Sequence, residues 1–250
     1  MLTILPLHDL SEIRPGDDLA ALLQGPLAAA GARAGDIVVI TQKIVSKAED
    51  RFVSLSEVTP SDEAVELAQR TRKDPRAVEL VLRESAAIVR AVPGVLIARH
   101  RSGHVMANAG IDRSNLGGGD EETVLLLPQD SDASAATIRE RLAEHLGFAP
   151  AVVISDSFGR PWRHGVSCVA IGAAGMPALH DRRGEADRDG RVLEVTQIGI
   201  ADMVACAAGL AMGEGAEGIP VAIVRGVDIN SAPHRPASAI VRPPEEDLFR

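Results

Sequence analysis

Short runs of aliphatic and β-branched residues recur along the chain between turn residues. Runs of this length, bounded by Gly, Pro, Asn and Asp, are typical of buried β-strands. The pattern predicts strands over residues 36–41, 95–99, 123–127, 151–155, 166–171 and 221–225.

Apolar residues at helical spacing predict four helices between these runs. The predicted ranges are 60–69, 75–90, 134–146 and 198–212. Ser61 is followed by two acids, which suits an N-terminal cap, and Ser134 is the expected cap of the third helix. Gly147 and Gly213 are the expected ends of the last two helices.

The predicted strands and helices do not alternate regularly. This order favours the α+β class, with mixed sheets and flanking helices, over a doubly wound parallel sheet. The length of 250 residues permits one large domain or two small ones, and the sequence has neither internal repeats nor a low-complexity linker. Segments 108–122, 156–165 and 180–191 are rich in Gly, Asp and Arg, and we expect them to be functional loops.

Composition narrows the classes of partner. Aromatic residues make up 2% of the chain, so stacking platforms for single-stranded nucleic acid are not expected. A net charge of −9 gives no general attraction to nucleic acid or to an anionic membrane. We therefore expect small-molecule substrates, no nucleic acid and no membrane.

The cysteines and the N-terminus point to the cytoplasm. Cys168 and Cys206 lie in apolar runs without a CxxC pair, which argues against zinc and predicts buried free thiols in a reducing compartment. The first residues lack the pattern of a signal peptide, and no apolar run approaches the roughly 20 residues of a membrane span.

Polar side chains follow the predicted strand at 151–155. Asp156 and Ser157 offer the oxygen ligands that Mg²⁺ prefers, while Arg160, Arg163 and His164 can meet anionic oxygens. The alternative is an Asx turn with solvated arginines.

A second loop contains Asp112, a candidate metal ligand, and Asn115, a candidate contact to a polar ligand edge. The glycines at 117–119 allow close approach of the backbone to phosphate, but a flexible turn has the same composition. No P-loop spacing (GxxxxGK[ST]) occurs in the chain.

Two further segments carry candidate groups. Lys43 and Lys47 lie in an expected polar turn after the first predicted strand, where either can neutralise a triphosphate or simply be solvated. Glu214 lies in a Gly-rich turn after the last helix, which suits a metal or phosphate site and equally a plain helix end. Acids, a hydroxyl and bases on separate loops together favour a metal–nucleotide site.

Four motifs then resemble one family. They are Asn-Ala-Gly-Ile-Asp-Arg-Ser-Asn at 108–115, Ile-Ser-Asp-Ser-Phe-Gly-Arg-Pro-Trp-Arg at 154–163, Gln-Lys-Ile-Val-Ser-Lys-Ala-Glu at 42–49, and Met-Gly-Glu-Gly at 212–215. In this order they resemble the coenzyme F420 γ-glutamyl ligases. The resemblance runs from the N-terminus to Gly226.

The resemblance implies a GTP-dependent amide ligase with an unusual α+β fold and an intertwined homodimer. It also implies that residues 1–250 form a single domain. Such enzymes add L-glutamate to the lactyl carboxylate of the unglutamylated coenzyme and extend a γ-linked tail. They use Mg²⁺ or Mn²⁺, and K⁺ is a further candidate cation. The implied metal ligands are Asp112, Asp156, Ser157 and Glu214, and the implied GTP contacts are Leu10, Ser11, Glu12, Ile13, Gln42, Lys47 and Asn115. Lys47 and Asp156 are the implied catalytic residues.

The sequence departs from the family where an acid commonly follows Asp202, because Met203 stands there, so this pair is given no catalytic role. Some members carry a C-terminal nitroreductase-like domain, whose activity is not expected here. The rival interpretations are a metal-dependent phosphatase or nucleotide hydrolase using the same acids, a non-catalytic nucleotide- or deazaflavin-binding module, and a globular scaffold with solvated loops.

Overall fold

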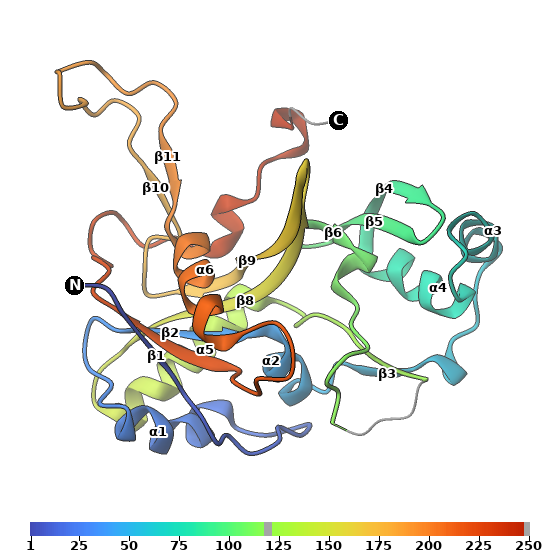
Figure 1. Ribbon diagram of the computed structural model, residues 1–250, viewed down its shortest axis with the longest axis horizontal. Coiled ribbons are helices and arrows are strands. Elements are labelled where there is room, and N and C mark those ends of the chain that lie inside the picture. The colour runs from blue at the N-terminus through green and yellow to red at the C-terminus, as the bar shows by residue number, and fades with distance from the viewer. Residues whose placement is uncertain (118–121, 248–250) are drawn as a thin grey trace.

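A five-stranded sheet forms the centre of the molecule. The computed structural model describes residues 1–117 and 122–247 (Figure 1). The strand order is β1-β12-β2-β8-β9, in which only β2 and β8 run parallel. The bounds are Thr3–Pro6 for β1, Val221–Arg225 for β12, Ile37–Thr41 for β2, Ala151–Arg160 for β8 and Arg163–Ala174 for β9.

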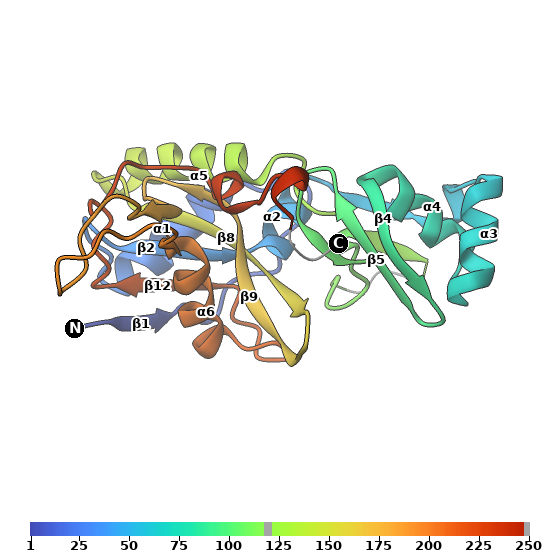
Figure 2. The same ribbon diagram turned by 90° about the horizontal axis from the view of Figure 1, so that it is seen from above.

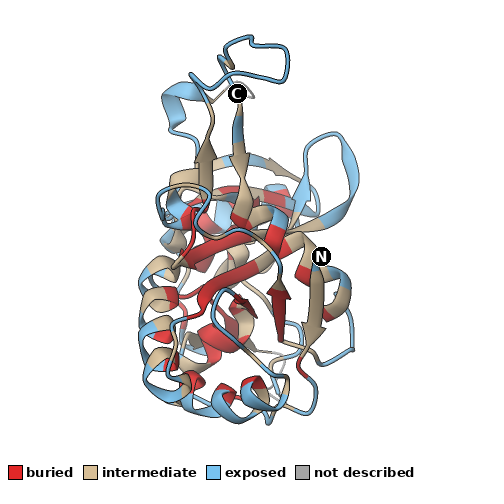
Figure 3. Ribbon diagram, turned by 90° about the vertical axis from the view of Figure 1, so that its left-hand side faces the viewer, coloured by how far each residue is buried: buried red, intermediate tan, exposed pale blue. Residues whose placement is uncertain are grey.

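Helices cover both faces of this sheet, as Figure 2 shows. Helices α1 (Leu19–Ala29) and α5 (Ser131–Leu146) pack on one face, and α6 (Ile200–Met212) packs on the other. In β2, Val38 packs in the apolar cluster on the side of α1 and α5, and Val39 packs in the cluster on the side of α6. Both side chains have an exposed fraction of 0%. Burial on both sides explains why the central strands are continuous apolar runs (Figure 3).

A smaller lobe lies beside the central sheet (Figure 1). Its three-stranded antiparallel sheet has the order β4-β5-β6, and two helices pack near it. A separate pair, β3 and β7, joins the lobe to α2. The bounds are Gln42–Ala48 for α2, Phe52–Ser54 for β3, Asp62–Thr71 for α3, Pro75–Glu84 for α4, Ser85–Val92 for β4, Val95–His100 for β5, Val105–Ala107 for β6 and Thr123–Leu125 for β7.

A long hairpin projects from the body next to α6 (Figure 1). Strands β10 (Leu179–Asp181) and β11 (Gln197–Gly199) form its base, and exposed residues form most of its tip. We call residues 179–199 the arm. No helix in the described parts of the chain combines the length and apolarity needed to cross a bilayer.

The structure confirms the α+β class, and each of the six predicted strands overlaps an observed strand. Ser61 caps α3 by accepting a hydrogen bond from the Ala64 N–H, as expected. Gly147 and Gly213 end α5 and α6 with positive φ angles. That residues 1–250 form one domain stays a prediction.

Four local predictions are wrong. The helix expected over 75–90 ends at Glu84, because residues 85–92 pair with β5 and tertiary pairing outweighs the helical pattern. The third helix begins at Ser131 rather than Ser134, since the Asp130 carboxylate accepts from the Ala133 N–H at 3.0 Å.

The third correction concerns the loop expected over 156–165. Strand β8 continues to Arg160 and forms a hairpin with β9, so Asp156 and Ser157 belong to a strand. The residues after the first predicted strand, expected as a polar turn, form helix α2. Ser157 pairs with Cys168 across the hairpin, which brings a thiol next to the candidate hydroxyl.

Candidate functional site

A cavity of about 640 Å³ opens at the carboxyl ends of β2 and β8. Because these two strands are parallel, the residues that follow them reach the same edge of the sheet. Thr41, Gln42 and Lys43 follow β2 there, and Asp156 and Ser157 continue β8. This is the edge at which open sheets of parallel strands commonly bind ligands.

Other segments complete the cavity wall. They are the stretch before α1, the loop after β6, the β9 residue Cys168 and the turn that follows α6. Every residue implied by the resemblance lines this one cavity: Leu10, Ser11, Glu12, Ile13, Gln42, Lys47, Asp112, Asn115, Asp156, Ser157 and Glu214. The structure thus brings the residues together, and their individual roles stay predictions.

Asp112 lies in a polar cluster on one side of the cavity. Lys43 Nζ is 2.7 Å from its Oδ2, and the Ser114 N–H donates to its Oδ1 at 2.8 Å. Burial alone raises the pKa of Asp112, but the hydrogen bonds and charge of Lys43 and Ser114 outweigh it and lower that pKa below its usual value. Asp112 is therefore a carboxylate held ionised by a lysine.

Asp156 has the opposite electrostatics. The pKa of its carboxyl group is raised to about 7, chiefly by burial and also by the nearby charges of Asp112 and Glu214, which together outweigh a hydrogen bond from the Ser157 N–H and the charge of Lys43. Carboxylates that converge in a half-buried site repel one another. A bound cation would relieve that repulsion.

Glu214 also lines the cavity, in the turn after α6. The Ser157 hydroxyl is 2.6 Å from each of its carboxylate oxygens, and the Cys168 thiol donates to Oε1 at 3.2 Å. Burial raises the pKa of the Cys168 thiol to about 12, and Glu214 adds to the shift, so the sulfur carries its proton. Two donors thus converge on one acid.

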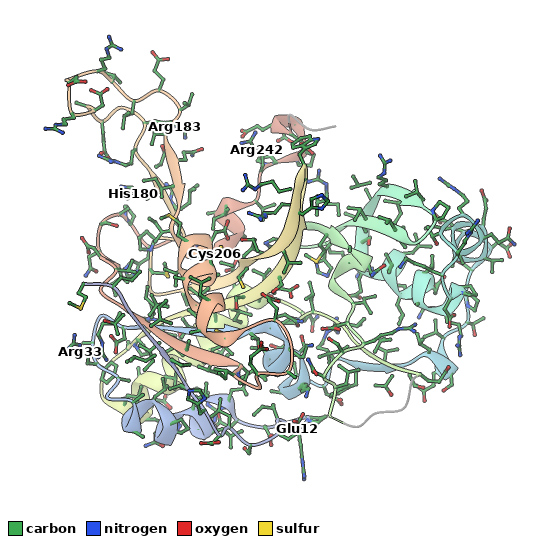
Figure 4. The ribbon with its side chains drawn as sticks, in the orientation of Figure 1. Glu12, Arg33, His180, Arg183, Cys206 and Arg242 are labelled. Atoms are coloured by element: carbon green, nitrogen blue, oxygen red, sulfur yellow. The ribbon has the colours of Figure 1, made fainter. Side chains whose placement is uncertain are left out.

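Lys47 is buried, with an exposed fraction of 4%, and forms an ion pair with Glu12. Figure 4 marks Glu12 on the stretch before α1, below α2. On the same helix, the Ser46 hydroxyl donates to Gln42 Oε1 at 2.9 Å and fixes the orientation of that amide. A buried lysine on the cavity wall is suited to meeting an anionic ligand that displaces Glu12.

The turn 213–218 forms part of the cavity wall. Asn115 Nδ2 donates to the Gly215 carbonyl oxygen at 3.3 Å, which joins the loop after β6 to this turn. A Cβ at Gly117 would lie 2.6 Å from Glu12 Oε1, so a side chain there would push against the Lys47–Glu12 pair. The glycines keep these three segments close together.

The donor set fits a hard divalent cation. Three carboxylates and one hydroxyl supply oxygen ligands, which Mg²⁺ and Mn²⁺ favour. Among the described residues, no three His, Cys, Asp or Glu side chains already stand as a closed metal-binding group. Lys43 and Ser157 engage the oxygens of Asp112 and Glu214 instead.

Several predicted residues lie elsewhere. Arg160, Arg163 and His164 are exposed around the turn of the β8–β9 hairpin and do not line the cavity. The predicted loop 180–191 belongs to the arm, and Arg183 there projects away from the body (Figure 4). Residues 118–121, including the last two glycines of the predicted triple-glycine turn, lie outside the described residues.

The structure adds two groups to the site residues that the resemblance implied. Lys43, an open candidate in the sequence, lies four positions before Lys47 on α2, so both side chains are on one face of that helix. Cys168, expected as a buried thiol, is half-buried and lines the cavity. Its pairing with Ser157 depends on the hairpin, which the sequence pattern did not predict.

Comparison with known proteins decides the family. Residues 9–226 match the family described as F420-0:Gamma-glutamyl ligase. The Coenzyme F420:L-glutamate ligase of Methanopyrus kandleri is 46% identical over 243 residues, which cover 96% of this chain and 94% of that protein. The protein of the same name from Methanothermobacter thermautotrophicus is 44% identical, with 94% and 93% covered. A third, from Haloarcula marismortui, is 42% identical, with 96% and 92% covered.

The chain belongs to the F420-0:gamma-glutamyl ligase family. The part of the chain matched to the γ-glutamyl ligase family includes every residue that the motifs implied, from Leu10 to Glu214. The family match ends at Gly226, shortly after β12. The chain beyond it reaches the smaller lobe, where Asp247 forms an ion pair with Arg99.

Proposed function

We propose that this protein is a coenzyme F420:L-glutamate ligase. It joins L-glutamate to the lactyl carboxylate of the unglutamylated deazaflavin coenzyme, uses GTP to activate that carboxylate, and extends the product through γ-linkages. The observation that carries the proposal is the convergence of acidic, basic and glycine-rich segments on one cavity, in a chain of this family.

The cavity suits a nucleotide triphosphate. Lys43 and Lys47 are neighbouring cations on one face of α2, and each is paired with an acid in this structure. Phosphate oxygens would replace the Glu12 carboxylate as the partner of Lys47, because a lysine ammonium is a compact donor to anionic oxygens. The Leu10–Ile13 stretch, Gln42 and Asn115 then form the remaining nucleotide contacts.

Asp112, Asp156, Ser157 and Glu214 would hold Mg²⁺ or Mn²⁺. The bound cation neutralises phosphate charge, and K⁺ is a further cation of the proposal. Ionised Asp112 already carries its charge, whereas Asp156, with a pKa near 7, gives up its proton when a cation binds. Ser157 orients Glu214 through its hydroxyl.

The chemistry begins with a poor electrophile, since a carboxylate resists attack by an amine. Transfer of the γ-phosphoryl group from GTP to one carboxylate oxygen gives GDP and an acyl phosphate. The glutamate amine then attacks the acyl carbon, and phosphate leaves with that oxygen. Lys47 offsets charge on the phosphoryl oxygens during the first step, and the half-buried cavity limits access of water to the acyl phosphate.

The homodimer, its intertwined arrangement, the unusual ligase fold and the cytoplasmic location belong to the same proposal. They rest on the family resemblance, and the curated relatives support the family itself. Size-exclusion chromatography with light scattering tests the dimer: a mass of two chains is expected, and a mass of one chain contradicts it.

Two measurements test the reaction. GDP should form only when coenzyme precursor and glutamate are both present; GDP release at the same rate without glutamate would instead indicate the rival nucleotide hydrolase. With ¹⁸O in the substrate carboxylate, one labelled oxygen should appear in the released phosphate. Unlabelled phosphate alongside amide product would contradict the acyl phosphate.

A further inference from the structure

A thiol lies among the oxygen groups of the cavity. Cys168 on β9 faces Ser157 on β8, with the sulfur 3.9 Å from the hydroxyl oxygen. The same sulfur lies 3.2 Å from Glu214 Oε1, and that carboxylate also accepts from Ser157. The three side chains come from two strands and a turn, so the contact joins elements distant in sequence.

Helix α6 is shaped to leave room for this thiol. A Cβ at Gly209 would lie 2.3 Å from Cys168 Sγ, which is closer than non-bonded atoms approach. Glycine in a helix interior costs about 1 kcal/mol relative to alanine. One turn earlier on α6, the Cys206 thiol donates to the Cys168 carbonyl oxygen at 2.9 Å (Cys206 is labelled in Figure 4). The Cys168 backbone is also held by its strand pairing with β8, and helix α6 leaves space for the Cys168 side chain.

The acid that receives the thiol hydrogen bond has little other support. Glu214 is exposed and lies between Gly213 and Gly215 in the turn after α6. A glutamate side chain loses up to about 2 kcal/mol of rotamer entropy when it is fixed. Ser157 and Cys168 are the donors to its carboxylate among the hydrogen bonds of the described residues.

We propose that Cys168 is a positioning residue that, with Ser157, holds the Glu214 carboxylate in the orientation that binds the divalent cation. The thiol acts through Glu214 and is not itself a cation ligand. This inference rests on the proposed function only in taking Glu214 as a metal ligand. It assigns a role to a side chain that neither the sequence motifs nor the family comparison singles out.

Binding of Mn²⁺ to the nucleotide-free protein tests this inference without any catalysis. Free Mn²⁺ is measured by electron paramagnetic resonance during titration of each variant. Cys168→Ala should weaken Mn²⁺ binding about 3- to 10-fold, the size expected for the loss of one ordinary hydrogen bond, because a thiol is a weak donor. Cys168→Ser should restore part of the affinity, because a hydroxyl also donates. Cys206→Ala, the matched control, should bind Mn²⁺ as the unmodified protein does.

Gly209→Ala reaches the same thiol from another element. Its methyl group should displace the sulfur and weaken Mn²⁺ binding by itself, but should add nothing in the Cys168→Ala background, where the clash is gone. Circular dichroism melting verifies that each variant is folded. If Gly209→Ala alone fails to fold, the Gly209→Ala/Cys168→Ala double variant is compared with Cys168→Ala instead, and the two should bind Mn²⁺ equally.

Three results would overturn the inference. The first is unchanged Mn²⁺ affinity in Cys168→Ala, and the second is a serine variant as weak as the alanine variant. The third is an equal loss in Cys206→Ala, which would indicate a general packing effect. Failure of the proposed function looks different, because unmodified protein would bind Mn²⁺ with the Cys168 dependence and yet form no glutamyl product.

Discussion

Replacing Asp156 by Asn should stabilise the metal-free protein while removing its ligase activity. The Asp156 carboxyl group has a pKa of about 7 in the folded protein, against 3.8 as its ordinary value, chiefly because it is buried. A group whose pKa is raised on folding binds more protons in the native than in the unfolded state between these two values. Stability therefore falls as pH rises from about 4 to about 7.

The size of this penalty follows from the shift. At 1.36 kcal/mol per pKa unit, ionising Asp156 costs about 4 kcal/mol of the free energy of unfolding by pH 8, and about 2 kcal/mol at pH 5. Asparagine has no charge to ionise and still accepts the hydrogen bond from the Ser157 N–H. Metal-free Asp156→Asn should thus exceed the unmodified protein in stability by more at pH 8 than at pH 5.

Urea unfolding at both pH values, with chelator present, measures this difference. Asp189→Asn is the matched control, since it removes the same charge from an exposed residue of the arm. Mn²⁺ at 100 times its dissociation constant should narrow the gap at pH 8 to about 1 kcal/mol, because it adds about 2.7 kcal/mol to the stability of the unmodified protein that binds it. A stability gap that is equal at pH 5 and pH 8, or that favours Asp156, would refute the reasoning.

Three further substitutions separate the cavity from the scaffold. Lys47→Met should lower kcat/KM for GTP at least about 100-fold with little change in melting temperature, and a loss under tenfold in steady-state kinetics would contradict a phosphate contact. Gly110→Ala should lower the free energy of unfolding in urea by about 2–4 kcal/mol, because the residue has φ +75° and its added Cβ would lie 2.7 Å from Leu127. Gly94→Ala is the control and should lower it by about 1 kcal/mol, because Gly94 has φ +80° but open space around it. Asp36 is 1% exposed and forms an ion pair with Arg225 far from the cavity. Asp36→Ala should lower the free energy of unfolding by about 3–5 kcal/mol, while kcat of the folded fraction should be unchanged. A fall in kcat would place this ion pair in the reaction.

The sequence pattern predicted four strands of the central sheet, missed its edge strand β1, and assigned β4 of the smaller lobe to a helix. Strand β2 is buried on both faces, so its continuous apolar run is a strong signal. Strand β4 has exposed and half-buried positions without strict alternation, and it follows α4 directly, so its residues extend the helical pattern. Its pairing with β5 decides its structure, and that pairing is not visible locally.

The candidate site divides in the same way. Asp156, Asp112 and Glu214 follow regular elements in glycine-rich sequence, which makes them recognisable, and the family motifs supplied their order. Cys168 was missed because its place depends on the register of a hairpin whose tip carries turn residues typical of a loop. Arg160 and Arg163 were overvalued for the same reason, since the hairpin carries them away from the cavity.

Mass spectrometry of the coenzyme tests the central claim most directly. Purified protein is incubated with the unglutamylated coenzyme, L-glutamate, GTP and Mg²⁺ or Mn²⁺, and Asp112→Asn is run in parallel. The account predicts successive mass gains of one glutamyl unit with the unmodified protein and none with Asp112→Asn. A coenzyme of unchanged mass in the presence of a folded, metal-binding protein would contradict the account.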